Sequence, residues 1–341
     1  MFLNHIHNYR AVAILGVVAT HALQNFHWPS ESLVFSGLNF IFNETSIWFV
    51  FIAGFLFQHL SGKFKFPKYL VSKAKFVVLP YLILSIPALI YFTLLARQDN
   101  VWTGFYDHSP MVQALLFLLT GKHLAPYWFI PMICLFYLLA PVFLRIDKSR
   151  FAYLWLLPPL LLLSAIFGRD GLLIHTPLDG RFATLSKALY MLPVYMLGML
   201  CSKYHDTLIT LLKRFNWALA AACLVMALLG ALYGKDAHFL HFLFKITTGV
   251  YLIYLLHLAD HPLGNRMTYL AHASFGVYFL HGYFLAAEKI LSDKLQVPAA
   301  IHEGNILSFT ILTLVVTALC VLTVKIAQLL LKDNSRLVVG S

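Results

Sequence analysis

Charged side chains and cysteines are both scarce in this sequence. Only 11% of its 341 residues are Asp, Glu, Lys or Arg, whereas soluble domains carry about 25%. This argues against a soluble enzyme, and loops at a membrane explain the net charge of +11 better than binding to nucleic acid does. The four cysteines lie in apolar segments and form no C-x-x-C pair, so we expect neither a disulfide framework nor a structural zinc site.

Apolar runs of about 20 residues recur along the chain, and this is the length that a helix needs to cross a bilayer. We therefore predict an all-α polytopic membrane protein, a bundle of about ten transmembrane helices that forms a single domain over residues 1–341. The segment 111–121 is apolar but too short to cross, so we expect it to be re-entrant or interfacial. The predicted spans are 9–27, 38–61, 74–96, 126–145, 151–168, 186–202, 214–234, 239–258, 268–291 and 305–331.

The distribution of Lys and Arg over alternate loops predicts the orientation. With the amino terminus in the cytoplasm, fifteen of them fall on cytoplasmic segments and eight on the other side. The loop between the second and third spans alone carries five lysines in thirteen residues. Because cytoplasmic loops are enriched in Lys and Arg, we predict that both termini are cytoplasmic. The first apolar run lacks a convincing cleavage site, so we expect it to be retained as a helix.

Two ionisable residues lie on the first predicted span, Arg10 at its entrance and His21 near mid-membrane. Ionisable groups are costly there and usually serve a substrate or a proton path. Eleven residues of helix leave the two side chains about 20° apart around the axis and about 16 Å apart along it, so they share one face. We predict that His21 is a general base and that Arg10 binds phosphate. The alternatives are a histidine that bonds a neighbouring helix and an arginine that anchors the helix end.

Lys73 and Lys75 stand at the predicted amino terminus of the third span. Free N–H groups and the helix dipole favour anions at such a position. We predict that both lysines help Arg10 to hold a phosphorylated co-substrate. The alternative is that they only follow the positive-inside pattern and attract anionic lipid.

Further candidates lie on the second, fourth and ninth predicted spans. Glu44, next to Asn43 near the outer start of the second span, is predicted to orient His21 or to take a proton from it; the alternatives are that it pairs with a cation on the outer side or only lies at the interface. We expect Asn43, His281 and Trp128 to contact the acceptor, although His281 also fits a structural helix–helix bond and Trp128 an interfacial aromatic belt. Two helically spaced histidine pairs lack a third ligand, so no metal site is predicted.

Several stretches occur in the order found in a known family. Arg10, ten intervening residues and His21 resemble the R-x10-H signature of the acyltransferase-3 membrane family. The stretch WFVFIAGFL at 48–56 resembles the aromatic-rich second span of that family. The stretch 73–81 is similar to its basic entry to the third span, with lysines where members often carry arginines. Two later stretches also resemble family motifs: 123–143 and 274–284.

The resemblance implies a bacterial enzyme of the cytoplasmic (inner) membrane, of the stand-alone branch without an extra soluble domain. It implies acetyl-CoA or another acyl-CoA as a cytoplasmic co-substrate and no permanently bound cofactor. The acceptor would be a surface glycan or a lipid-linked sugar, and nucleic acid would not be a partner. Together with the spacing on the first span, this predicts an O-acyltransferase, most simply an O-acetyltransferase, in which His21 takes the proton of the attacking hydroxyl.

Two other functions remain open at this point. A secondary transporter or a lipid-linked sugar flippase would also place Arg and His inside a multi-span bundle. Many transporters contain inverted repeats, and we find none in this sequence. A membrane-bound O-acyltransferase of another type usually places its histidine later in the chain, and His281 would then replace His21 as the base.

Overall fold

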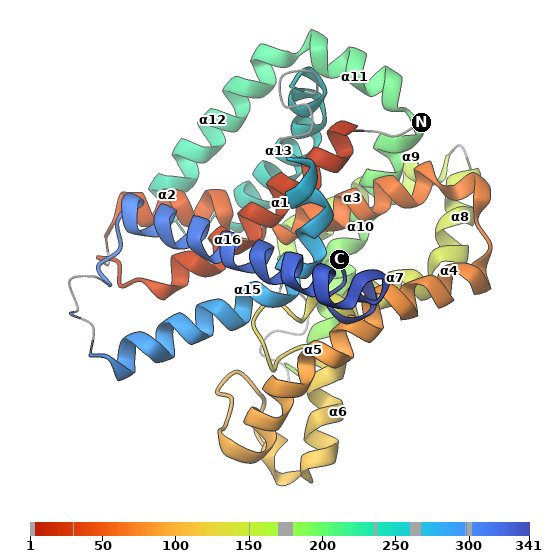
Figure 1. The fold of residues 1–341 in the computed structure, drawn as a ribbon. Helices are drawn as coiled ribbons and strands as arrows, with labels where there is room; N and C mark the ends of the chain where they lie inside the picture. The colour runs from red at the N-terminus through yellow and green to blue at the C-terminus, as the bar shows by residue number, and fades with distance from the viewer. Residues whose placement is uncertain are drawn as a thin grey trace.

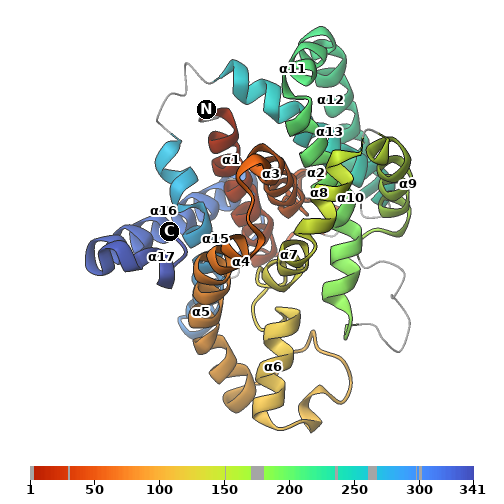
Figure 2. The ribbon, with the colours of Figure 1, turned by 90° about the vertical axis from the view of Figure 1, so that its right-hand side faces the viewer.

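The computed structural model describes residues 4–29, 31–149, 151–169, 180–234, 237–259, 267–296, 298 and 302–341. Every regular element in these ranges is a helix, and no β-strand occurs among them, which confirms the predicted all-α polytopic class (Figures 1 and 2). Arg150, Lys235 and Arg266, which entered the charge count, lie outside the described residues. The α-helices are α1 (Asn4–Ala22), α2 (Leu33–Phe42), α3 (Ser46–His59), α4 (Phe66–Lys73), α5 (Leu79–Ile90), α6 (Pro110–Thr120), α7 (Phe129–Leu138), α8 (Ala140–Lys148), α9 (Ala152–Phe167), α10 (Ala183–Lys203), α11 (His205–Arg214), α12 (Asn216–Tyr233), α13 (His238–Leu258), α15 (Thr268–Lys294), α16 (Ile306–Leu331) and α17 (Ser335–Val338).

Six helical segments of the described chain are long and apolar enough to cross a membrane. They correspond to predicted spans and are Leu33–His59, Phe66–Leu95, Ala183–Lys203, Asn216–Tyr233, His238–Leu258 and Ile306–Val338. The helices α7 and α8 add a seventh candidate, bent by 56° just before Pro141, whose ring cannot continue the helical hydrogen bonding. Helix α6 has 11 residues and is too short to cross, as expected for 111–121.

Helices also occupy the three remaining predicted spans, although none of them passes the same test of length and apolar character. These helices are α1, α9 and α15. Helix α9 is short, with 16 residues, and α1 and α15 carry polar side chains. The number of about ten spans therefore stays a prediction.

Helix α1 lies inside the bundle. It contacts α3, α13, α15 and α16, and most of its residues are buried (Figure 1). Polar residues on α1 therefore face other helices instead of lipid tails. This placement matters because α1 carries both Arg10 and His21.

Close packing of α3 against α10 depends on two glycines. A side-chain Cβ at Gly54 would overlap the backbone carbonyl of Tyr195, and a Cβ at Gly198 would overlap that of Phe51. Small residues of this kind let helix backbones approach closely within a membrane. The contact holds α3, which follows directly after Glu44, in a fixed position beside α10.

The helical path from α2 to α3 is interrupted at Asn43–Thr45. Glu44 adopts a left-handed backbone conformation with φ 57°, which non-glycine residues rarely do. Backbone carbonyl groups that lose their helical partners at the interruption accept hydrogen bonds from side chains of other helices. The Thr20 hydroxyl donates to Phe42 O over 2.5 Å, and Lys245 Nζ donates to Ile41 O over 2.5 Å.

The segment from α4 to α5 is continuous but contains a π-helical turn, Ala74–Val78. Pro80 lacks an N–H group and crowds the carbonyl of Phe76, four residues earlier, which accounts for the wider turn at this point. A π-helical turn takes up more residues than an α-helical one, so side chains beyond Lys73 point in directions that an unbroken helix would not give them.

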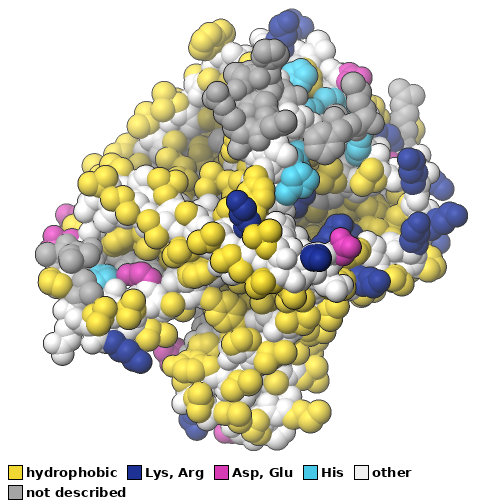
Figure 3. Space-filling model, in the orientation of Figure 1, with side chains coloured by type: hydrophobic (Ala, Val, Ile, Leu, Met, Phe, Trp, Pro, Cys, Tyr) yellow, Lys and Arg dark blue, Asp and Glu magenta, His cyan; other side chains and the backbone are white. Residues whose placement is uncertain are grey.

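The surface of the molecule agrees with a membrane location. Hydrophobic side chains cover much of the face in Figure 3, and Lys and Arg gather at its right-hand side, over α4 and α8. Large exposed apolar residues occur on nearly all of the long helices, for example Leu94 and Leu330. Such a surface is stable only against lipid or another protein.

Candidate active site

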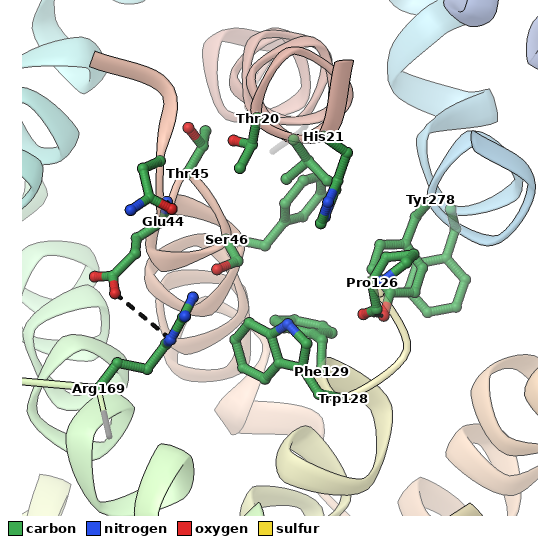
Figure 4. Close-up of a pocket in the computed structure, with 14 residues that line it drawn as sticks. Thr20, His21, Glu44, Thr45, Ser46, Pro126, Trp128, Phe129, Arg169 and Tyr278 are labelled. Carbon is green, nitrogen blue, oxygen red and sulfur yellow. Dashed lines mark hydrogen bonds and ion pairs between the residues drawn. The ribbon is translucent and has the colours of Figure 1, made fainter. Parts of the chain in front are cut away.

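A cavity lies between α1, the α2–α3 interruption, the segment before α7, and α15 (Figure 4). The cavity is small, with a volume of about 50 Å³, which is below the range of roughly 300–1,000 Å³ typical of small-molecule sites. Four residues predicted from the sequence to form the site line this cavity: His21, Asn43, Glu44 and Trp128. Residues from predicted spans one, two and four therefore meet at one place.

The imidazole of His21 points into the cavity from α1 and is partly buried (Figure 4). Its ring centroid lies 5.3 Å from that of His281 on α15. His281 is fully buried and does not line the cavity, so it supports His21 instead of forming the cavity wall. Its Nδ1 lies 3.0 Å from Val277 O and must carry the proton, because a carbonyl only accepts. Its Nε2 is buried without a hydrogen-bond partner among the described residues.

The carboxylate of Glu44 lines the cavity and is held by three side chains. The Tyr190 hydroxyl donates to Oε2 over 2.6 Å, Arg169 Nε lies 3.6 Å from Oε1, and His241 Nδ1 lies 3.9 Å from Oε2. The left-handed backbone at Glu44 turns this side chain toward the cavity at the point where the helix is interrupted. Backbone strain of this kind, which costs on the order of 1–3 kcal/mol, is found mainly at functional sites.

Arg169, two residues after α9, also lines the cavity, and sequence reasoning counted it only as a basic residue of an outer loop. Figure 4 shows its guanidinium and the imidazole of His21 directed into the same space. The two groups are close enough for their charges to interact. Nothing in the local sequence marks Arg169, because only the tertiary fold brings it to Glu44.

Asn43 and Trp128 both line this cavity, Asn43 at the helix interruption and Trp128 as an aromatic wall. The Asn43 side-chain oxygen accepts the backbone N–H of Glu44 over 3.0 Å, so Asn43 stabilises the interruption as well as lining the space. The Trp128 indole forms one wall, and Lys187 Nζ lies 4.7 Å from its ring centre. An aromatic wall beside polar groups is suited to a sugar ring, which has both apolar faces and hydroxyl edges.

The predicted phosphate-binding residues lie apart from the cavity. Arg10 is not among the lining residues, and its Nη2 donates to Ser274 Oγ on α15 over 3.1 Å. Lys73 Nζ lies between two aromatic rings, 5.2 Å from the centre of Tyr69 and 4.9 Å from that of Tyr137. Lys73 and Arg10 are close enough for their charges to repel each other.

No observed contact brings Lys75 close to Lys73 or Arg10. Its side chain is exposed, and it forms no ion pair with any residue of the described chain. Residues two positions apart differ by about 200° around a helix, so Lys75 points away from Lys73. Across the described ranges, no group of three His, Cys, Asp or Glu side chains is arranged to hold a metal ion.

A family model described as an acyltransferase domain, acyltransferase-3, matches residues 4–325. The chain belongs to the acyltransferase-3 family. The family resemblance inferred from the ordered motifs is thereby confirmed, and the protein is a membrane acyltransferase. No curated protein and no solved structure matches the chain. The matched stretch of this acyltransferase includes every residue of the cavity and ends before α17.

Proposed function

We propose that this acyltransferase moves an acetyl group from cytoplasmic acetyl-CoA to a hydroxyl of a surface glycan or lipid-linked sugar, with His21 as the general base. The observation that carries the proposal is the cavity in which the His21 imidazole faces the Glu44–Arg169 pair. Acyl transfer to a hydroxyl requires a titratable base and a positive charge held nearby, and both line this cavity. Family membership supports acyl transfer over the transporter alternative.

In the proposed reaction, a ring nitrogen of His21 takes the proton of the sugar hydroxyl while the oxygen attacks the thioester carbonyl carbon. The C–O bond forms, and the carbonyl oxygen of the tetrahedral intermediate carries the negative charge. The C–S bond then breaks, and the thiolate of CoA takes the proton from the imidazolium. The products are the acetyl ester and CoA, so atoms and charge balance without another reactant.

His281 would set the tautomer of His21. Its Nδ1 proton is directed to Val277 O, so the unpartnered Nε2 is an acceptor. A hydrogen bond from one His21 nitrogen to that acceptor would leave the other nitrogen free as the base. Orientation of a histidine through its second nitrogen is common in enzymes.

Arg169 would stabilise the charged intermediate. Its Nε faces the Glu44 carboxylate, which leaves the terminal nitrogens available to donate to the thioester oxygen. Glu44 would hold the guanidinium and would not itself take the proton. A preorganised donor at a developing oxyanion is usually the largest single contribution to such catalysis.

The donor would enter from the end of α1 that carries Arg10. Ser274 contacts Arg10, and the next residue, Phe275, lines the cavity, so α15 connects the two places. Arg10 and Lys73 would hold the CoA phosphates while the pantetheine arm extends along α1 toward His21. This arrangement agrees with the cytoplasmic termini that the charge distribution predicts, and with the bacterial inner membrane that the family resemblance implies.

The test uses membranes from cells that produce the protein, supplied with radiolabelled acetyl-CoA. Label should appear in a glycan or lipid-linked sugar, and mass spectrometry of surface glycans should show the added acetyl ester. The variant His21→Ala should abolish transfer, while its amount in the membrane and its thermal unfolding remain unchanged. Full transfer by this variant would refute the mechanism, and transport without consumption of acetyl-CoA would favour a transporter.

The variant His281→Ala separates the two possible bases. If His21 is the base, loss of His281 should slow transfer by about 10- to 100-fold, as for a residue that orients the base. If His281 were the base, its loss would abolish transfer and loss of His21 would only slow it.

A further inference from the structure

A third cation, Arg336, lies beside Arg10 and Lys73. It belongs to α17, which contacts α5 and the π-helical turn before it. Its guanidinium carbon lies 4.3 Å from the ring centre of Phe76 within that turn. Lys73 directly precedes the same turn, and Arg10 bonds Ser274, two residues before the Gly276 N–H that Ser341 accepts. Arg336 on α17 therefore lies against the π-helical turn that follows Lys73, although the two segments are far apart in sequence.

Among the described residues, these three cations have no acidic partner. Arg10 bonds a neutral hydroxyl, and Lys73 and Arg336 lie against aromatic rings. Cations held together repel one another, and a bound anion with several charges relieves this repulsion.

The position of Arg336 is fixed by the residues that follow it. The Ser341 hydroxyl oxygen accepts the Gly276 N–H over 2.8 Å, and the Val339 side chain is buried. Gly340 has φ 77°, and a Cβ at this position would lie 2.8 Å from a ring carbon of Phe275. The segment 335–341 is therefore packed onto α15 next to Ser274, the residue that Arg10 bonds.

We propose that Arg336 completes a three-cation site with Arg10 and Lys73 that binds the phosphate groups of the CoA donor. This inference rests on the proposed function and adds a residue beyond the stretch that the family model matches. Guanidinium groups bind phosphate oxygens through forked donors, and a lysine adds a point charge. CoA offers a diphosphate and a separate phosphate monoester, so its charge suits three cations better than that of a single phosphate.

The same chemistry could also bind the phosphate of an anionic lipid, and the experiment separates the two sources. Purified protein is reconstituted in vesicles of phosphatidylcholine alone or with phosphatidylglycerol. Binding of CoA itself is measured by its effect on thermal unfolding, and the KM for acetyl-CoA is measured by transfer. The CoA binding measurement does not depend on acyl transfer, so it remains informative if the proposed reaction is wrong.

Arg336→Gln should weaken CoA binding and raise the KM for acetyl-CoA by about three- to tenfold in both vesicles, with kcat unchanged. The effect should be smaller with 3′-dephospho-acetyl-CoA, which lacks one phosphate. Gly340→Ala should raise the KM in the same way, because it displaces the segment that holds Arg336. Lys332→Gln, which removes an exposed lysine of the same region, is the matched control and should change neither quantity.

Unchanged CoA binding and KM in Arg336→Gln would overturn the inference. So would an equal effect of Lys332→Gln, which would indicate only general surface charge. An effect of Arg336→Gln confined to vesicles with phosphatidylglycerol would assign Arg336 to a lipid headgroup and would also overturn it. If wild-type protein binds CoA through Arg336 but transfers no acetyl group, the proposed reaction fails and this site stands.

Discussion

Arg169 Nε lies 3.6 Å from the Glu44 carboxylate at the wall of the cavity that His21 enters. The two residues come from distant parts of the sequence, the α2–α3 interruption and the segment that follows α9. Neither ion of the pair is fully exposed, so the pair keeps a defined position. In the proposed reaction, this pair matters as much as the histidine itself.

Replacement of Arg169 tests its role in the transition state. Arg169→Gln should lower kcat for acetyl transfer by about 100- to 1,000-fold, as for the loss of an oxyanion donor. The KM for acetyl-CoA should change little, because the proposed phosphate site at Arg10, Lys73 and Arg336 lies apart from this cavity. Steady-state kinetics on reconstituted protein provides the measurement. A rise in KM with kcat preserved would instead assign Arg169 to substrate binding.

Glu44 and Arg169 should behave as one unit. Glu44→Gln keeps an acceptor for the Tyr190 hydroxyl but removes the charge that holds Arg169, so kcat should fall by about 10- to 100-fold. The double variant Glu44→Gln with Arg169→Gln should lose less than the product of the two single effects. Tyr190→Phe is the control and should have the smallest effect. Independent, multiplicative losses would contradict the coupling.

The glycines between α3 and α10 should be required for stability. Gly54→Ala places a methyl group against the Tyr195 carbonyl, and we expect a loss of about 1–3 kcal/mol in the free energy of unfolding. Gly62→Ala is the matched control, because nothing lies within 4 Å of a Cβ at that position. Its effect should stay within about 0.5 kcal/mol. Thermal unfolding in detergent compares the two, and equal melting temperatures would exclude the close-packing argument.

Stability should decrease on acidification because of His123, which lies in the segment between α6 and α7. This side chain is fully buried, with Nε2 2.8 Å from Ser85 Oγ, and burial lowers its pKa to about 4. The unfolded chain takes up the proton below about pH 6.5, and the folded protein only below about pH 4. Stability is therefore complete above pH 6.5 and is lost between pH 6.5 and 4, by up to about 3 kcal/mol.

The variant His123→Gln gives the control for this pH dependence. It should be less stable than the wild type at pH 7.5, because it alters a buried hydrogen-bonded group, but its loss between pH 6.5 and 4 should be smaller. Thermal unfolding at several pH values measures both. An identical pH dependence in the two proteins would mean that other groups cause the loss.

Much of the site was predictable, because helical spacing and residue type carry the relevant information. Eleven residues of helix determine the common face of Arg10 and His21, and the structure places both of these residues on α1 inside the bundle. Asn43, Glu44 and Trp128 also line the cavity, as expected for residues near the outer ends of their spans under the predicted orientation.

The remaining residues depend on features that are not local. Arg169 and Arg336 meet their partners only through tertiary packing, and a basic residue at a helix end has the same local sequence whatever it contacts. Lys75 was grouped with Lys73 because both stand at the predicted amino terminus of the third span. Residues two positions apart differ by about 200° around a helix, so a shared helix end does not give the two lysines a shared direction. His281 was expected at the cavity wall but lies behind His21, since depth alone does not specify the direction of a side chain.

The rigid helix α1 has a consequence for the choice of donor. Since one uninterrupted helix carries both Arg10 and His21, their separation of about 16 Å cannot adjust to the ligand. In the proposed reaction, the thioester of the donor reaches His21 only if the arm between thioester and nucleotide spans that distance while the nucleotide is bound at Arg10. Short synthetic thioesters without the nucleotide would have to find the base by free diffusion, and longer acyl groups would be limited by the cavity and not by the arm.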